Sequence, residues 1–179
     1  MSERDDEQLL ALWAAALNPP AEVLERSSKP SALLSPSARA RLMEALEAEP
    51  YLPFASELAR SFALAEPDMR SLLRRLVDPK AWTRGIPPFE AFIDFSPGTT
   101  LHPLRAGFVR HGGGARLPLH RHKQRELTYV LAGVMVDGEG RRFGPGDSVD
   151  MPVGSVHSIG VPEGESALVA LLHGAIEMV

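Results

Sequence analysis

Large apolar side chains recur every three or four residues along the first 85 positions, which is the spacing of one face of an α-helix. Prolines interrupt this pattern. Ser35-Pro36 is typical of a helix start and Asp78-Pro79 of a helix end, because a residue before proline avoids the helical region. We therefore expect four helices. Their apolar stripes are Leu9, Trp13 and Leu17; Leu42, Met43 and Leu46; Phe54, Leu58 and Phe62; and Met69, Leu72, Leu73, Leu76 and Val77.

After Pro87-Pro88 the apolar runs become short, and several alternate with polar residues as the two faces of a β-strand do. Turn-forming steps such as Pro97-Gly98 and Asp137-Gly138 separate them. Many short strands at close spacing predict an all-β sandwich or barrel. The expected strands cover residues 89–95, 105–110, 126–131, 134–137, 148–151 and 168–173.

These two patterns divide the chain into an α-helical region, residues 1–85, and a β domain, residues 86–179, with a linker at residues 81–88. The helical region is a candidate for binding a partner or for forming a homodimer. One helical pair, residues 58–73, has the layout of a helix-turn-helix. Its turn lacks the glycine often found there and its leucines have core spacing, so we do not expect it to read DNA.

The composition narrows the classes of function. The chain has 179 residues, is 44% apolar and carries a formal net charge of −4 with both signs interspersed, so no direct nucleic-acid contact is expected. An apolar stretch of about 18 residues, which a membrane span needs, is missing. The start MSERDDEQ lacks the order of a secretory signal, so we expect a cytoplasmic protein. The chain contains no cysteine, which excludes disulfides, a thiol nucleophile and any cysteine-based zinc site.

All six histidines lie in the C-terminal half, and four residues there have the spacing of metal ligands. His120 and His122 are two apart and would point to the same side of a strand. Glu126 opens the next strand, and a turn rich in glycine and proline delivers His157 onto another. Three imidazoles and one carboxylate suit one divalent ion, Fe(II), Mn(II), Ni(II) or Zn(II), with two coordination positions left for water, oxygen or a ligand.

The other polar groups match no motif. His102, His111 and His173 are expected to be ordinary residues, and His111, beside three glycines, is the nearest of them to a barrel mouth. An enzyme would also need an acid or base within reach of its substrate. The candidates are Tyr129, Arg110, His111 and Arg121. Tyr129 has the opposite strand parity to Glu126, so it should face away from the metal.

Two motifs carry a resemblance to a known superfamily. The pattern His120-x-His122-x-x-x-Glu126, followed by Gly133, resembles the first motif of the cupin superfamily. Gly146, Pro152-x-Gly154 and His157 resemble the second, with Val161 where a polar residue is often seen. The resemblance implies a mainly β protein: a C-terminal cupin domain, which is a double-stranded β-helix or jelly-roll barrel, with an N-terminal α-helical region.

Residues 100–175 also resemble the cupin domain of ChrR-type anti-sigma factors, through Glu126-Leu127-Thr128, Val130-Leu131 and Gly144-x-Gly146-Asp147. This resemblance implies that His120, His122, Glu126 and His157 bind the metal, that zinc is the favoured ion, and that the domain is a sensory or regulatory module acting on a sigma factor or another transcription-related protein.

The N-terminal region departs from that family, whose helical domain normally holds zinc with a histidine and a Cys-x-x-Cys pair. This chain has no cysteine and no histidine before His102. A zinc-clamped anti-sigma domain is therefore excluded. Two interpretations stay open: helices that grip a partner without zinc, and helices that pack on the barrel or form a dimer contact.

Whether the protein is an enzyme also stays open. The open metal positions favour a small metal-dependent enzyme, dioxygenase-like, as the alternative to a sensory module that binds a small-molecule ligand. Cupin lyases that act on dimethylsulfoniopropionate often place a tyrosine where this chain has Thr128, which counts against that chemistry.

Overall fold

The computed structural model describes residues 35–37, 39–40 and 49–179. The chain divides into two compact units, residues 1–45 and 46–179. The predicted helix around Trp13 lies outside the described residues, as do the apolar positions of the next one. The predicted start of that second helix agrees with the structure, because Pro36 and Ser37 are helical and the Arg39 N–H donates to the Ser35 carbonyl at 2.9 Å.

The two helices predicted next are confirmed. Helix α4 covers Ala55–Ser61 after the 3₁₀ turn η1, Leu52–Phe54, and helix α5 covers Glu66–Arg74. Helix α5 begins with Pro67 in its first turn and two acidic residues that favour the positive end of the helix dipole. Short 3₁₀ turns follow at Arg75–Val77 (η2) and Pro79–Ala81 (η3), on either side of the predicted stop at Asp78. No helix in the described ranges is long and apolar enough to cross a membrane.

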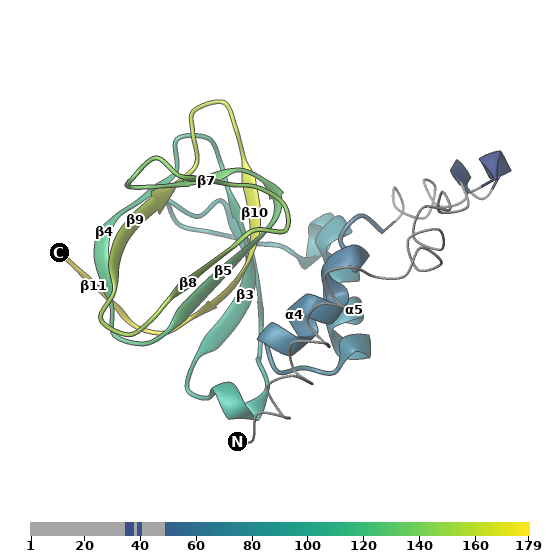
Figure 1. Cartoon of the computed structure of the whole chain (residues 1–179), viewed down its shortest axis with the longest axis horizontal. Helices are drawn as coiled ribbons and strands as arrows, with labels where there is room; N and C mark the ends of the chain where they lie inside the picture. Colours follow the sequence, from purple (N-terminus) through teal and green to yellow (C-terminus); the bar gives the residue numbers. More distant parts are fainter. Residues whose placement is uncertain (1–34, 38, 41–48) are drawn as a thin grey trace, which may run out of the picture. The chain divides into compact units, whose positions relative to one another are not determined.

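The rest of the second unit is a two-sheet barrel (Figure 1). One sheet has six strands in the order β1-β2-β3-β10-β5-β8, and the other has five in the order β11-β4-β9-β6-β7. The strands are β1 Thr83–Arg84, β2 Ala91–Phe95, β3 Arg105–His111, β4 Arg116–His122, β5 Glu126–Gly133, β6 Met135–Asp137, β7 Arg142–Phe143, β8 Ser148–Met151, β9 Val156–Gly160, β10 Ala167–His173 and β11 Ile176–Met178. All paired strands are antiparallel. The predicted fold class is thus confirmed.

The six-stranded sheet is buried on both faces. Its outer face packs against α4 and α5, where Leu58 and Met69 meet Phe108 in one fully buried cluster. Its inner face forms a second cluster inside the barrel, which includes Val130 and Val169. Strands buried on both faces have near-continuous apolar sequences rather than alternating ones. This explains why β5 and β10 consist almost entirely of apolar residues.

Packing of the helices on the barrel was one of the two interpretations left open, and α4 and α5 follow it. The Trp82 indole and the Arg110 guanidinium both donate to the Leu76 carbonyl, each at 3.2 Å, and Arg110 lies 3.9 Å from the centre of the Trp82 ring. Residues expected as a linker, Thr83 and Arg84, form β1 and pair with β2. The division of the chain at residue 85 stays a prediction.

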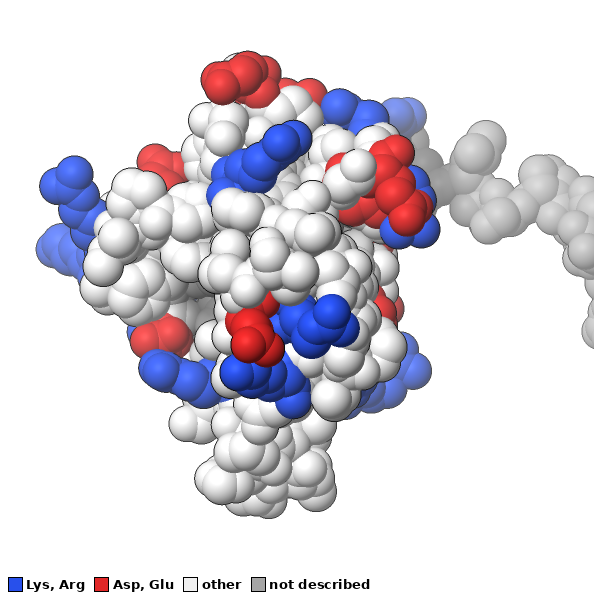
Figure 2. Space-filling view, turned by 90° about the vertical axis from the view of Figure 1, so that its left-hand side faces the viewer, with Lys and Arg blue, Asp and Glu red and all other residues white. Residues whose placement is uncertain are grey.

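Charge is scattered over the side of the barrel that carries β4, β9 and β11. Figure 2 shows lysines and arginines there, interspersed with acidic residues and separated by uncharged surface. Two ion pairs of the barrel are Lys123 with Glu177, 3.7 Å apart, and Arg125 with Asp150, 2.7 Å apart.

Candidate metal centre

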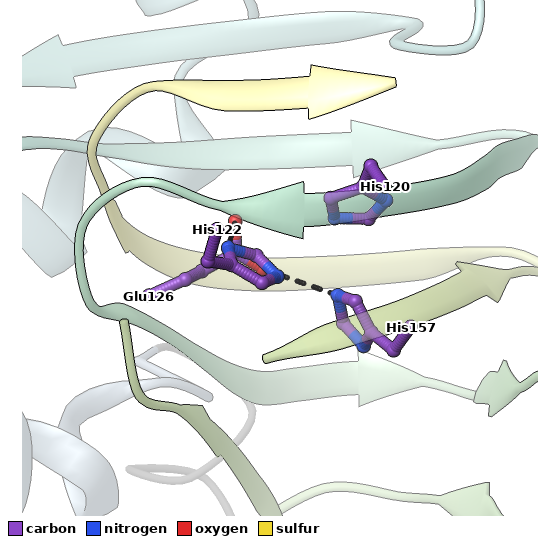
Figure 3. Close-up of side chains that lie close together, drawn as sticks. All are labelled: His120, His122, Glu126 and His157. Atoms are coloured by element: carbon purple, nitrogen blue, oxygen red, sulfur yellow. Dashed lines mark ion pairs between the residues drawn. The ribbon is translucent and has the colours of Figure 1, made fainter. Parts of the chain in front are cut away.

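The structure brings the four predicted ligands together at one end of the barrel. His120 and His122 point inward from β4, and His157 lies on the neighbouring strand β9, directly paired with His120. Glu126 reaches the same point from β5 in the opposite sheet. One ligand atom from each residue lies within 4.8 Å of those from the other three (Figure 3).

A tight turn holds the two histidine strands in this register. The Gly154 N–H donates to the His122 carbonyl at 2.8 Å, and the His122 N–H donates to the Ser155 carbonyl at 3.0 Å. Gly154 has φ +84°, a conformation that a residue with a side chain rarely adopts. The Pro-x-Gly step therefore folds the chain onto the end of β4, and β9 begins at Val156, one residue before His157.

The three Nε2 atoms of the histidines have no hydrogen-bond partner in the described part of the chain. The Nε2 atoms of His120, His122 and His157 are buried and accept or donate no hydrogen bond. The two Glu126 oxygens stand 3.8 Å from His122 Nδ1 and 3.9 Å from His157 Nε2, which is too long for hydrogen bonds. Buried polar atoms are normally satisfied, so an orphaned set that converges on one point is the arrangement expected around an ion.

One ligand is already fixed in the required tautomer. His120 Nδ1 lies 2.7 Å from the Pro118 carbonyl oxygen. A carbonyl oxygen can only accept, so Nδ1 carries the hydrogen, and in a neutral ring Nε2 then keeps its lone pair. Metal-bound histidines commonly have such a hydrogen bond on the other ring nitrogen.

Burial and the charges of neighbouring imidazoles lower the pKa values of His122 and His157. Burial, followed by the charges of His120 and His122, lowers the pKa of His157 to about 4. Burial and the His120 charge also lower the pKa of His122. Burial raises the pKa of the Glu126 carboxyl to about 7, against a weak hydrogen bond of 3.4 Å from the Thr128 hydroxyl. Neutral imidazoles present lone pairs, and a buried carboxylate gains from a nearby cation. These residues fit a metal, and the cluster could hold a metal ion.

A cavity of about 450 Å³ opens beside this cluster inside the barrel. Glu126 and Thr128 line it on the metal side, and aliphatic and aromatic side chains form most of its wall. Its volume falls in the range of about 300–1,000 Å³ that is usual for small-molecule sites. A molecule in the cavity could therefore contact an ion held by the four residues.

The structure separates the other candidate residues. The Tyr129 hydroxyl faces the helices, where it donates to Glu57 Oε2 at 2.9 Å, as its strand parity predicted. Arg110 also faces the helices, and the Arg121 guanidinium donates to the Gly154 carbonyl at 3.0 Å. Of the four proposed acids and bases, only His111 lines the cavity, where it is 8% exposed and packs against Phe89 with ring centres 5.5 Å apart.

Sequence reasoning missed three polar residues of the cavity. Asp94, Arg105 and His173 line it, on β2, β3 and β10. A signal was present: Arg105, Val109 and His111 share one parity, and so do Val169, Leu171 and His173. This parity identifies cavity residues only once the order of the strands in the sheet is known, and no local sequence pattern predicts that order.

Comparisons with known proteins agree with this fold. Residues 107–173 match the family model described as "Cupin domain". Together with the two-sheet barrel, this match shows a cupin-like fold for this part of the chain. No curated protein sequence matches the chain.

Several solved structures match the chain at low identity. The crystal structure of Rhodobacter sphaeroides SigE in complex with the anti-sigma ChrR matches with 22% identity and a TM-score of 0.50, over 90% of this chain and 78% of that one. A cupin-like protein from Thermotoga maritima matches with 20% identity and a TM-score of 0.47, over 54% and 84%. A protein with a cupin-like fold from Ralstonia eutropha has 24% identity and a TM-score of 0.38, over 40% of this chain and 47% of that one, so the match spans about half of its length.

Proposed function

We propose that His120, His122, Glu126 and His157 bind one divalent metal ion, and that the barrel is a sensory module whose state is read by a transcription-related protein partner. The set of three imidazoles and one carboxylate suits Zn(II), Fe(II), Mn(II) or Ni(II), and the ChrR-type resemblance of the sequence favours zinc. When bound, the ion would supply a Lewis-acidic centre at the edge of the cavity.

Strand β5 is the observation that carries the regulatory part. Alternate residues of this strand face opposite sides of the sheet, so Glu126 and Thr128 line the cavity while Tyr129 contacts the helices. The Tyr129 hydroxyl is hydrogen-bonded to Glu57 of α4, and its ring meets Phe54 edge-on with centres 5.7 Å apart. A shift of β5 on metal or ligand binding would therefore move a residue that holds the helical layer.

The proposed partner follows from the resemblance, and the packing of α4 and α5 limits the surface to which it could bind. One structural neighbour is a complex of SigE with the anti-sigma ChrR, and we propose a sigma factor as the first partner to test. The buried faces of α4 and α5 are already occupied, since Leu58, Phe62 and Met69 have no exposed surface. A partner would bind the exposed faces of these helices or residues 1–45.

The test is the affinity of the full chain for the sigma factors of its source organism, measured by calorimetry with zinc and after chelation. We expect one factor to bind with a metal-dependent affinity. His122→Ala should abolish the dependence of the affinity on metal, because the metal is lost. Tyr129→Phe should weaken this dependence while the metal stays bound. Tyr51→Phe is the matched control, because Tyr51 packs beside the same core and the described residues offer its hydroxyl no hydrogen bond. Binding of no sigma factor, or an affinity indifferent to metal, would contradict the proposal.

The cavity beside the metal site supports a second candidate, a small metal-dependent enzyme of dioxygenase type. Glu126 belongs both to the ligand cluster and to the cavity wall, so a substrate there would lie next to the ion. The measurement is oxygen uptake by the iron-loaded protein with a panel of carbonyl and thiol compounds. Uptake that depends on a compound and is lost in His122→Ala would support the enzyme, and its absence across the panel would leave the sensory module.

A further inference from the structure

Apart from His111, the charged and imidazole side chains of the cavity are gathered at the end nearest the metal cluster. In the six-stranded sheet, Leu172 pairs with Leu127, so His173 and Glu126, the next residues along, lie at the same level. His173 in turn pairs with Arg105 on β3. Glu126, His173 and Arg105 thus form one row across three adjacent strands, and all three line the cavity.

The Arg105 guanidinium has no protein partner in this row. Within residues 49–179 it forms neither an ion pair nor a side-chain hydrogen bond. Arg105 is exposed at the cavity mouth, whereas two other arginines of the barrel have acidic partners: Arg125 lies 2.7 Å from Asp150, and Arg142 lies 2.8 Å from Glu165. An unpaired guanidinium on a cavity wall is suited to a carboxylate, which it can bind through two parallel hydrogen bonds.

The same mouth carries one negative charge. Asp94 pairs with Gly107, and its Oδ1 lies 3.5 Å from where a Gly107 side chain would begin, so the glycine leaves room for the carboxylate on the inner face. Asp94 would repel a second anionic group on a ligand held by Arg105. The charges therefore favour a ligand with a single carboxylate.

The rest of the cavity is apolar and long. From Arg105 to His111, β3 has seven residues, and the six steps between them span about 20 Å at the usual rise of a strand. Val109, Val169, Leu171 and Ile159 line this length, and His111 closes the far end. Burial lowers the pKa of His111 to about 4, so its ring is neutral at pH 7 and offers no second charge to the ligand.

We propose that the cavity binds a monocarboxylic acid with an apolar chain, its carboxylate held by Arg105 beside the metal cluster and its chain lying along Val109, Val169 and Leu171 toward His111. This proposal rests on the proposed function, because it names the class of small molecule that the sensory module would bind. Arg105 acts here as the residue that selects a carboxylate over a neutral head group, and the apolar wall beyond it disfavours a second carboxylate at the other end of the chain.

The experiment compares three probes with the same eight-carbon chain: octanoate, its neutral amide and octanedioate. Binding to the full chain is measured by calorimetry, with zinc and after chelation. We expect octanoate to bind about tenfold more tightly than either of the others, as one hydrogen-bonded charge pair gives. Arg105→Gln should weaken octanoate about tenfold and leave the amide unchanged. Arg84→Gln, which removes an exposed arginine of the same sheet, is the matched control.

Equal affinities of the wild type for octanoate and the amide, or an unchanged octanoate affinity in Arg105→Gln, would overturn the proposal. So would the absence of octanoate binding, or tighter binding of octanedioate. The amide serves as an internal check of folding, because a misfolded variant would lose it too. A failure of the proposed metal site can be distinguished from a failure of this proposal. The preference for octanoate over the amide is measured in chelated protein, and the zinc content is measured on the same sample.

Discussion

The Tyr129 hydroxyl donates a hydrogen bond of 2.9 Å to Glu57 Oε2 and so joins strand β5 to helix α4 across 72 residues of sequence. Burial, followed by this hydrogen bond, raises the pKa of Tyr129 to about 12, which keeps the phenol in the protonated form that donates. Tyr129→Phe should lower the free energy of unfolding by about 1 kcal/mol, the usual net value of one hydrogen bond. Urea unfolding of Tyr129→Phe, Glu57→Gln and the double variant checks this, and additive effects would show that the two residues are not coupled.

His122→Ala should remove most of the metal. The other ligands cannot replace an inward imidazole on the same strand. Even the loss of a hydrogen-bond partner of a metal ligand costs about 10- to 100-fold in metal affinity. Elemental analysis of the purified protein should give one ion per wild-type chain and little in the variant. His102→Ala, at an exposed residue outside the cluster, should keep the full amount. Equal metal content in His122→Ala would refute the ligand assignment.

Gly133→Ala should be strongly destabilising. Gly133 has φ +74°, and a methyl group there would collide with the Ser166 carbonyl oxygen. Gly140 has φ +83° but nothing within 4 Å of the added methyl, so Gly140→Ala carries the backbone strain alone. We expect a loss of about 1 kcal/mol for Gly140→Ala and at least twice that for Gly133→Ala. Thermal unfolding of both variants provides the comparison, and equal losses would show that the backbone relieves the collision.

His111 should make the protein less stable in acid. Its pKa in the folded chain is about 4, below the usual 6.5, because burial disfavours the charged ring. Between these two values the unfolded chain holds more protons, so stability falls as the pH falls from 6.5 toward 4, by on the order of 3 kcal/mol in total. His111→Gln should reduce the change in the free energy of unfolding between these two pH values. Unfolding at pH 4.5 and 7.5 tests it, and parallel curves for wild type and variant would contradict the pKa shift.

The sequence predicted the parts of the fold that depend on local pattern. Helices α4 and α5 were recognisable because the apolar residues around Leu58 and Leu73 have helical spacing and because Asp78-Pro79 ends the helical segment. Strands β5 and β10 were found as apolar runs. The short strands β1, β7 and β11 have two or three residues and gain their pairing from neighbours, which no local signal records.

The four residues of the metal cluster could be grouped in advance because their spacing along two strands and one turn is local. The cavity could not. Arg105, Asp94 and His173 meet Glu126 only through the order β2-β3-β10-β5, in which strands distant in sequence are neighbours. The sequence also did not reveal that Tyr129, correctly expected to face away from the metal, would contact a helix residue 72 positions earlier.

Because the six-stranded sheet is covered on both faces, consecutive residues of its central strands belong to different interiors. In β5, Val130 packs inside the barrel and Leu131 packs on the side of the helices, and in β10 the same holds for Val169 and Leu168. A combinatorial library that varies only the positions on the cavity side would thus change the cavity lining and leave the residues that contact α4 and α5 unchanged. Because of this alternation, the contacts with a ligand and the contacts with the helices are made by different positions of the same strands.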